Sequence, residues 1–424
     1  MKRRLLNLRD RVRRSSALDV GAVLAVTISV QGLTVVAQFL IAVAVGPEQL
    51  GLIRWLESAF AIGLLATSCG MPSVVFREAA LCGSAGERFR LFARAAVIAS
   101  SAAGLVFVVG LGAYGTLKLL SATAAWAMLA AMTGALWPAN VARIGIAMIQ
   151  GGQLSRAMWP RLLTYSGAAI ALLSSATWMF GVKGWVTARY VVEFGLATLV
   201  VHALAQPHLE LAGLAGSRRD LQRLFRLGSS ANFAFLARAI SDNLPVLLLK
   251  SDLSSPSELG WYAFANLTIL VPTLFLSVLM QTRLPTLVQS VHDLPEFAKQ
   301  LSRTQRELLR AGGVGFCVMA GLAFLLHWKV ALADYTNAAW PLVILGATLP
   351  FRALILTAGS AAVAQGRYAI SSILAFTEIA IVMVAALGGR ANTATEMASA
   401  VLGASALSML PALALIRFSR KTGP

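Results

Sequence analysis

The sequence contains little charge, little histidine and little cysteine. Only 13% of its 424 residues are Asp, Glu, Lys or Arg, and it has four histidines and three cysteines. An average soluble domain carries about 25% charged residues, so this composition argues against a soluble protein. The cysteines are too few and too widely spaced for a disulfide framework or a zinc site. We expect no metal and no cofactor, and the absence of a G-x-x-x-x-G-K-S/T motif excludes a P-loop motor in this chain.

Apolar residues, in contrast, make up 58% of the chain and occur in long runs. About 20 residues of helix cross a hydrocarbon layer of about 30 Å, and most of these runs reach that length. The sequence therefore predicts an all-α polytopic membrane protein with about twelve transmembrane helices. The spans are expected at about 18–45, 50–76, 91–114, 121–149, 160–181, 185–205, 227–249, 259–282, 308–327, 338–364, 369–387 and 396–416.

The net charge of +18 is distributed unevenly among the loops between these spans. With the N-terminus inside, the termini and the even-numbered loops hold 26 of the 36 basic residues, and the odd-numbered loops hold five. This bias predicts that both termini face the cytoplasm. Because orientation in a membrane accounts for the basic residues, we expect membrane lipids and not nucleic acid as partners.

Two stretches of the first half recur in the second half. GPEQLGLIRWLESAFAIGLL (46–65) aligns with SPSELGWYAFANLTILVPTL (255–274), sharing a proline and the dipeptide Leu-Gly. LWPANVARIGIAMIQGG (136–152) aligns with TLPFRALILTAGSAAVAQG (348–366), again on a proline. Two matches in the same order predict two parallel six-helix repeats around a central cavity. The expected parts are a cytoplasmic basic N-terminus (1–17), a first bundle (18–205), a cytoplasmic linker (206–226), a second bundle (227–416) and a cytoplasmic tail (417–424).

Several of these motifs resemble a known family. They are G-P-E-x-L-G after the first span, Gly70-Met71-Pro72 followed by Arg77, DNLPVLLLK from Asp242, L-G-W-Y at the start of span 8, and TRLPTL at its end. The chain resembles the polysaccharide-flippase branch of the MOP superfamily, which is related to the lipid II flippase and the MATE exporters. One departure is Ile53, which stands where the second half has the aromatic Tyr262.

The resemblance implies a MATE-like fold and a function in cell-surface polysaccharide synthesis, such as that of lipopolysaccharide or exopolysaccharide. The implied substrate is a polyprenyl-pyrophosphate-linked oligosaccharide, flipped by alternating access from the cytoplasmic to the outer leaflet of the bacterial inner membrane. A polysaccharide polymerase and a chain-length regulator are the partners that it implies. The chain itself is expected not to be an enzyme.

Charged residues inside the predicted spans are the candidate functional residues, because each costs several kcal/mol in hydrocarbon unless it pairs or faces water. Three pairs are spaced to share a helix face and neutralise each other. Arg143, Arg352 and Glu378 have no partner on their own helix. The full set is Arg54, Arg143, Arg189, Arg238 and Arg352 with Glu57, Glu193, Asp242 and Glu378.

Arginines suit an anionic ligand, because the guanidinium fork stays charged and matches phosphate oxygens. Arg238 and Arg352, near the middle of their spans, are the main predicted substrate contacts, and Arg143, Arg54 and Asn140 are the others. Carboxylates on a dry helix face can bind a proton, so coupling to protons or sodium is a hypothesis. The predicted coupling or gating residues are Glu378, Asp242, Glu57 and Glu193, with the unpaired Glu378 favoured.

Structural explanations for the same residues remain open. Arg238 and Asp242 can form an ion pair that touches no ligand. Arg54 and Arg143 can extend to the nearer membrane surface. Asn140 can form a helix-to-helix hydrogen bond.

Other functions also remain open. A MATE-like exporter of small cations favours a cavity of net negative charge, whereas the spans here hold five arginines and four acids. A membrane enzyme of polysaccharide assembly needs a sizeable outer loop, and the predicted outer loops are short. A scaffold without transport activity is the third alternative.

Overall fold

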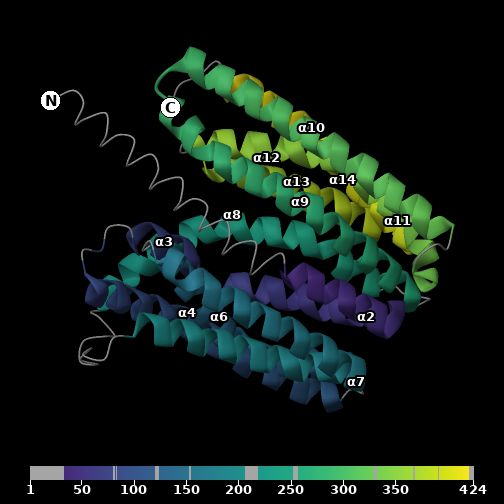
Figure 1. Cartoon of the computed structure of the whole chain (residues 1–424), viewed down its shortest axis with the longest axis horizontal. Helices are drawn as coiled ribbons and strands as arrows, with labels where there is room; N and C mark the ends of the chain where they lie inside the picture. The colour runs from purple at the N-terminus through teal and green to yellow at the C-terminus, as the bar shows by residue number, and fades with distance from the viewer. Residues whose placement is uncertain are drawn as a thin grey trace. The chain divides into compact units, whose positions relative to one another are not determined.

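A computed structural model describes most of the chain as α-helix (Figure 1). The described residues are 33–79, 82, 84–119, 124–151, 154–205, 218–251, 256–328, 332–365, 368–389 and 391–419. Their helices are α2 (Leu33–Ser68), α3 (Met71–Ala79), α4 (Ala85–Leu119), α5 (Ala124–Thr133), α6 (Leu136–Gly151), α7 (Ser155–Leu204), α8 (Arg218–Ser251), α9 (Pro256–Ser290), α10 (Leu294–His327), η2 (Ala333–Ala338), α11 (Ala339–Gly346), α12 (Leu349–Ala364), α13 (Tyr368–Leu387) and α14 (Ala394–Ser419).

The lengths and hydropathy of these helices confirm a multi-pass membrane protein. Within the described residues, six helices (α2, α4, α7, α9, α10 and α14) are long and apolar enough to cross a membrane, and η2–α11 with α12 makes a seventh, bent by 40°. Both α2 and α7 include residues of two predicted spans, separated by glycines in the left-handed region, Gly46 (φ 72°) and Gly181 (φ 59°). With these breaks, predicted spans 2 to 12 correspond to described helical segments, whereas residues 18–32 of the first predicted span lie outside the described residues.

The two prolines of the second sequence match lie at equivalent helix breaks. Pro138 lies in the first turn of α6, directly after the break from α5, and Pro350 lies in the first turn of α12, directly after the break from α11. Proline is tolerated in the first turn of a helix because its missing N–H would have no partner there. The shared break supports the predicted internal repeat.

The contacts divide the chain into two compact units. The N-terminal unit comprises Met1–Gln38 and Gly63–Asn232, and the C-terminal unit comprises Phe39–Ile62 and Phe233–Pro424. The middle of α2 thus groups with the second unit, which differs from the expected bundles at 18–205 and 227–416. The expected linker at 206–226 also differs, because α8 already begins at Arg218.

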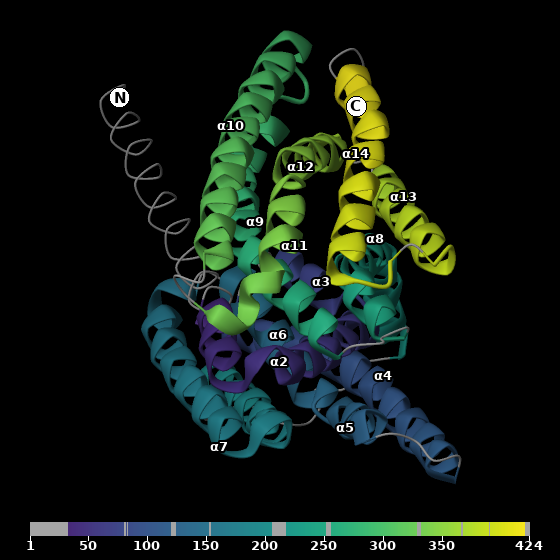
Figure 2. The same ribbon diagram turned by 90° about the vertical axis from the view of Figure 1, so that its right-hand side faces the viewer.

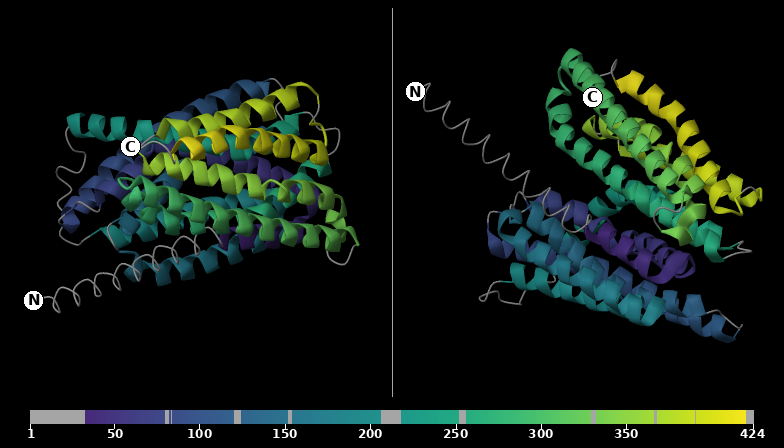
Figure 3. Two further views of the ribbon diagram at one scale, coloured as in Figure 1. Left: turned by 90° about the horizontal axis from the view of Figure 1, so that it is seen from above. Right: turned by 45° about the vertical axis from the view of Figure 1, so that its right-hand side comes forward.

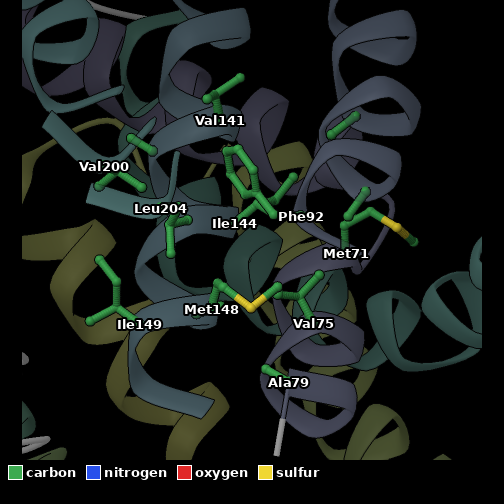
Figure 4. Close-up of a cluster of buried hydrophobic side chains, with 14 of the residues drawn as sticks. Met71, Val75, Ala79, Phe92, Val141, Ile144, Met148, Ile149, Val200 and Leu204 are labelled. Carbon is green, nitrogen blue, oxygen red and sulfur yellow. The ribbon is translucent and has the colours of Figure 1, made fainter. Parts of the chain in front are cut away.

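Each unit has its own packing. In the N-terminal unit a buried apolar core joins α3, α4, α6 and α7, with Met71, Phe92, Ile144, Met148 and Val200 among its members (Figure 4). In the C-terminal unit α12 contacts α9, α10, α13 and α14, and α11 contacts α9, α10 and α14 (Figure 2 and Figure 3).

A glycine crossing explains why the middle of α2 belongs to the C-terminal unit. A Cβ on Gly51 would lie 2.8 Å from the backbone N of Gly260, and one on Gly260 would lie 1.9 Å from the carbonyl O of Pro47. Gly51 and Gly260 are the glycines that the first sequence match aligns, so the two repeat-related Leu-Gly pairs lie directly against each other. Nearby, the Tyr335 hydroxyl donates to the carbonyl of Ala42 (2.8 Å).

We expect Gly260→Ala to destabilise the C-terminal unit by about 1–3 kcal/mol, because the new methyl group forces two backbones apart. Thermal unfolding of the purified protein in detergent measures this loss. Gly104→Ala is the control, because a Cβ at Gly104 of α4 meets nothing within 4 Å. An unfolding temperature for Gly260→Ala equal to that of the control would contradict the tight crossing.

Candidate functional site

Three of the four charged residues predicted within spans of the second half line one recess of the C-terminal unit. It lies among α8, α12, α13 and α14, and its polar lining consists of Ser241, Asp242, Arg352, Glu378 and Ser405. Two of the main predicted charged residues, Arg352 and Glu378, therefore meet there although they lie on different helices. Val382, Val401 and Ala404 complete the wall.

Arg238 holds two carboxylates beside this recess. Its Nε and Nη2 donate to the two oxygens of Asp242 (3.1 and 2.9 Å), and its Nη1 donates to Oε2 of Glu378 (3.0 Å). The Ser241 hydroxyl also donates to Glu378 Oε2 (2.7 Å). We call Arg238, Asp242 and Glu378 the ion triad. It links α8 to α13 and carries a net charge of −1.

The ion triad changes two predictions. Glu378 is not unpaired, because it accepts from both Arg238 and Ser241, and its side chain is only 7% exposed. Arg238 is engaged by Asp242 and Glu378, as the structural alternative describes, although 34% of its side chain stays exposed. The spacing of Arg238 and Asp242 indicated their pairing, but sequence reasoning had no information on which helix faces α8.

Arg352 differs from Arg54 and Arg238, the other arginines predicted within spans of the C-terminal unit, because both of those pair with carboxylates. It is half-buried in the first part of α12, and within the described residues no carboxylate lies within ion-pair distance of it. Its Nε is buried and has no hydrogen-bond partner in the structure. A buried donor without an acceptor is unfavourable, so Arg352 is the residue of this recess with unused capacity to bind an anion.

Arg54 and Glu57 form a buried pair in the middle of α2. Arg54 Nη1 lies 2.7 Å from Glu57 Oε2, and the two side chains are 8% and 12% exposed. The neighbouring Trp55 is also buried, at 7%. The Arg54 side chain is therefore buried in the protein and does not extend to the membrane surface. This burial also gives no support to the prediction that Arg54 contacts the substrate.

The predicted site residues of the N-terminal unit do not line this recess, which belongs to the C-terminal unit. Asn140 is fully buried, and its Nδ2 donates to Thr67 Oγ1 (2.8 Å). The prediction of Asn140 as a substrate contact is therefore not supported by the structure, which shows a bond between α6 and α2 instead. Arg189 pairs with the buried Glu193 (2.8 Å), and Arg143, which is exposed, lies within electrostatic range of both.

Two serines are functional candidates that sequence reasoning missed. Ser241 holds Glu378, and Ser405 of α14 lines the recess. The signal for Ser241 was its position three residues after Arg238, on the helix face that also carries Asp242. Ser405 had no signal, since serine is common in membrane helices.

Replacing Arg238 alone should destabilise the protein more than replacing Arg238 and Glu378 together. Arg238→Met leaves a buried anion at Glu378, and we expect a loss of roughly 1–3 kcal/mol, less than the 3–5 typical of a fully buried pair because Arg238 is partly exposed. Adding Glu378→Gln removes the anion and should recover part of the loss. Thermal unfolding of the four members of this double-mutant cycle measures the coupling.

The control for this cycle is Arg303→Ala, which removes an exposed arginine 3.0 Å from Glu307. Exposed pairs contribute at most about 1 kcal/mol, so this change should be small. Additive effects of Arg238→Met and Glu378→Gln would contradict the coupling.

Comparison with known proteins gives the fold. No protein-family model matches the chain, and no curated protein matches it in sequence. Among solved structures it is similar to an inward-facing multidrug resistance MATE family transporter of the MOP superfamily, with 12% identity, a TM-score of 0.75 and coverage of 95% of this chain and 100% of that one. It is also similar to the lipid II flippase MurJ in an inward closed conformation, with 15% identity, a TM-score of 0.67 and coverage of 95% and 87%.

A third similar structure is a MOP superfamily transporter from Pyrococcus furiosus, described as having a binding pocket of reversed polarity, with 13% identity, a TM-score of 0.58 and coverage of 95% of both chains. At such low identity a structural likeness shows the fold and leaves the substrate open. The chain has the fold of the MOP-superfamily transporters.

Proposed function

We propose that this chain is a transporter that flips a polyprenyl-pyrophosphate-linked oligosaccharide from the cytoplasmic to the outer leaflet of the bacterial inner membrane. The observation that carries the proposal is Arg352, whose guanidinium lines the recess without a carboxylate partner among the described residues. Support also comes from the motif resemblance to polysaccharide flippases and from the shared fold with a lipid II flippase.

Phosphate is the ligand group that suits Arg352 best. A guanidinium presents its N–H donors in a plane and can give two parallel hydrogen bonds to phosphate oxygens. In a lipid-linked oligosaccharide the pyrophosphate carries the charge, between the sugar and the polyprenyl tail.

The ion triad supplies a means of coupling this binding to protons. An anion at Arg352 would share the recess with Asp242 and Glu378, and like charges at short distance repel. Protonation of one of the two carboxylates removes that repulsion. We therefore propose that proton uptake at the ion triad accompanies substrate binding, and that the site needs no metal or organic cofactor.

The distribution of Lys and Arg supports an orientation with both termini in the cytoplasm. In this orientation the substrate enters from the side on which lipid-linked sugars are assembled and leaves toward the side on which they are polymerised. A polysaccharide polymerase and a chain-length regulator are the protein partners that fit this place. The shared fold with transporters supports transport over enzymatic assembly of the polysaccharide.

Export of small cations is the second candidate function. It is favoured by the net negative charge of the ion triad and by the 40% exposure of the Asp242 side chain. The fold is shared with MATE transporters as well as with MurJ, so it does not separate the two candidates. The two functions place opposite demands on Arg352, because a free cation opposes a cationic ligand and binds an anionic one.

Arg352→Ala should reduce flipping of a lipid-linked oligosaccharide in proteoliposomes by at least about tenfold, because a charge-assisted hydrogen bond of about 1.5–3 kcal/mol is lost. Arg352→Lys should retain part of the activity. The readout is the time course with which a labelled polyprenyl-pyrophosphate sugar becomes accessible to periodate in the outer leaflet. Arg310→Ala, which removes an exposed arginine of α10, is the matched control and should be unaffected.

The same vesicles test the alternative. Uptake of a fluorescent cation that increases in Arg352→Ala, with no flipping of the lipid-linked sugar by the wild-type chain, would overturn the proposed substrate. Flipping that is indifferent to imposed proton and sodium gradients would remove the coupling and leave the substrate assignment in place.

A further inference from the structure

A second cavity lies entirely within the N-terminal unit, whereas the ion triad belongs to the C-terminal unit. It has a volume of about 370 Å³ and is bounded by the end of α3, the first turns of α4 and the first turns of α8. Three arginines (Arg90, Arg94, Arg223), three acids (Glu78, Glu87, Asp220), Cys82 and three leucines (Leu91, Leu224, Leu227) line it. The proposed function uses none of these residues.

The cavity has a packed wall behind it. Ala79 and Phe92 (Figure 4) and Leu224, one from each of its three helices, all belong to the buried apolar core of the N-terminal unit. The helix α8 is held there by a close backbone approach, since a Cβ on Gly70 would lie 2.1 Å from the carbonyl O of Gly228. The helices that carry most of the lining side chains are therefore held in place by the core.

The charges of the lining are only partly neutralised inside the protein. Arg94 Nη1 lies 3.3 Å from Asp220 Oδ2, while Arg94 Nε is buried without a hydrogen-bond partner. Glu87 is engaged at the start of α4, where it accepts from the backbone N–H of Ser84 (3.4 Å). Within the described residues, Arg90, Arg223 and Glu78 form no ion pair.

Two available guanidinium groups and one available carboxylate select for a ligand that carries both signs. A purely anionic ligand would face Glu78, and a purely cationic one would face Arg90 and Arg223. Leu91 and Leu227, neither of them fully buried, give the same cavity an apolar side. A phosphate with a primary ammonium and an adjoining acyl chain satisfies all three features.

We propose that this cavity binds a phosphoethanolamine group, with the phosphate on Arg90 and Arg223 and the ammonium on Glu78. A phospholipid headgroup is the favoured source, because the leucines offer a path for its acyl chains. Its site lies among the basic loops that orient the chain, where inner-leaflet lipid is present. The inference does not depend on the transported substrate, since the recess at Arg352 belongs to the other unit.

Cys82 provides a probe of the cavity. Burial, and then the carboxylate of Glu87, raises the pKa of the Cys82 thiol, with Glu78 adding to and Arg88 opposing the effect. The thiolate is the reactive form, so maleimide labelling should speed up as the pH rises. In a Cys69→Ser, Cys317→Ser background, Glu87→Gln should make labelling at fixed pH faster and shift its pH profile to lower pH. An unchanged profile would show that Glu87 does not act on Cys82.

The proposal is tested by protection of Cys82 from maleimide in the same full-length background in detergent. Dihexanoylphosphatidylethanolamine at ten times its Kd should slow labelling about tenfold, because occupancy removes the open site. Dihexanoylglycerol, which lacks the headgroup, should have no effect. Free O-phosphoethanolamine tests the source: protection by it at the same concentration identifies a soluble ligand of the same chemistry, and protection by the lipid alone identifies the headgroup.

Three variants test the assignment of residues. Arg90→Ala with Arg223→Ala should abolish protection, whereas Arg226→Ala, an exposed arginine of α8 outside the lining, should leave it intact. Glu78→Gln should remove the preference for phosphatidylethanolamine over phosphatidylglycerol. No protection of the unmutated site by either phosphoethanolamine compound would overturn the proposal. Equal protection by inorganic phosphate or by phosphatidylglycerol would overturn the role of the ammonium.

Discussion

A charge placed within a membrane-spanning helix has to be neutralised by the protein, and this constraint explains the ion pairs among the charged residues of the predicted spans. Water is not available in hydrocarbon, so an unpaired ion there costs several kcal/mol. The chain meets the constraint with short pairs on one helix, at Arg54–Glu57 and Arg189–Glu193, and with the ion triad, which reaches from α8 to α13. The exception in the C-terminal unit, Arg352, stands out because the other charges follow the rule.

The backbone follows a related rule at the places where the helices break. Gly46 and Gly181, in the left-handed region, allow α2 and α7 to turn between two predicted spans. At the breaks between α5 and α6 and between α11 and α12, a proline lies in the first turn of the second helix. The glycine crossing of α2 and α9 goes further, because only residues without a Cβ let two backbones come within contact distance. These positions set which segments pack together, and so which charged residues can meet.

The sequence was sufficient to predict the all-α membrane fold, the helical segments and the internal repeat, because apolar length and repeated Leu-Gly and proline positions are local signals. Pairing along one helix was equally accessible, as Arg54–Glu57 shows. The pairing of Glu378 with Arg238 could not be predicted from the sequence, because it depends on which face of α13 packs beside α8. The role of Asn140 could not be predicted from the sequence either. A polar residue in a span can face a neighbouring helix or a ligand, and only the packing of the helices distinguishes the two.

The two candidate binding places use arginine under different physical conditions. Beside the ion triad, arginine is partly buried among the helices of the C-terminal unit, where a low dielectric makes each interaction strong and each unpaired group costly. A single uncompensated guanidinium can therefore decide whether the recess accepts an anion or a cation. At the ends of α3, α4 and α8 the arginines are partly solvated, so one charge decides little, and selectivity requires several groups of both signs around one ligand. This difference explains why the substrate assignment of the recess depends on Arg352 alone, whereas the lipid assignment of the second cavity depends on the arrangement of Arg90, Arg223 and Glu78.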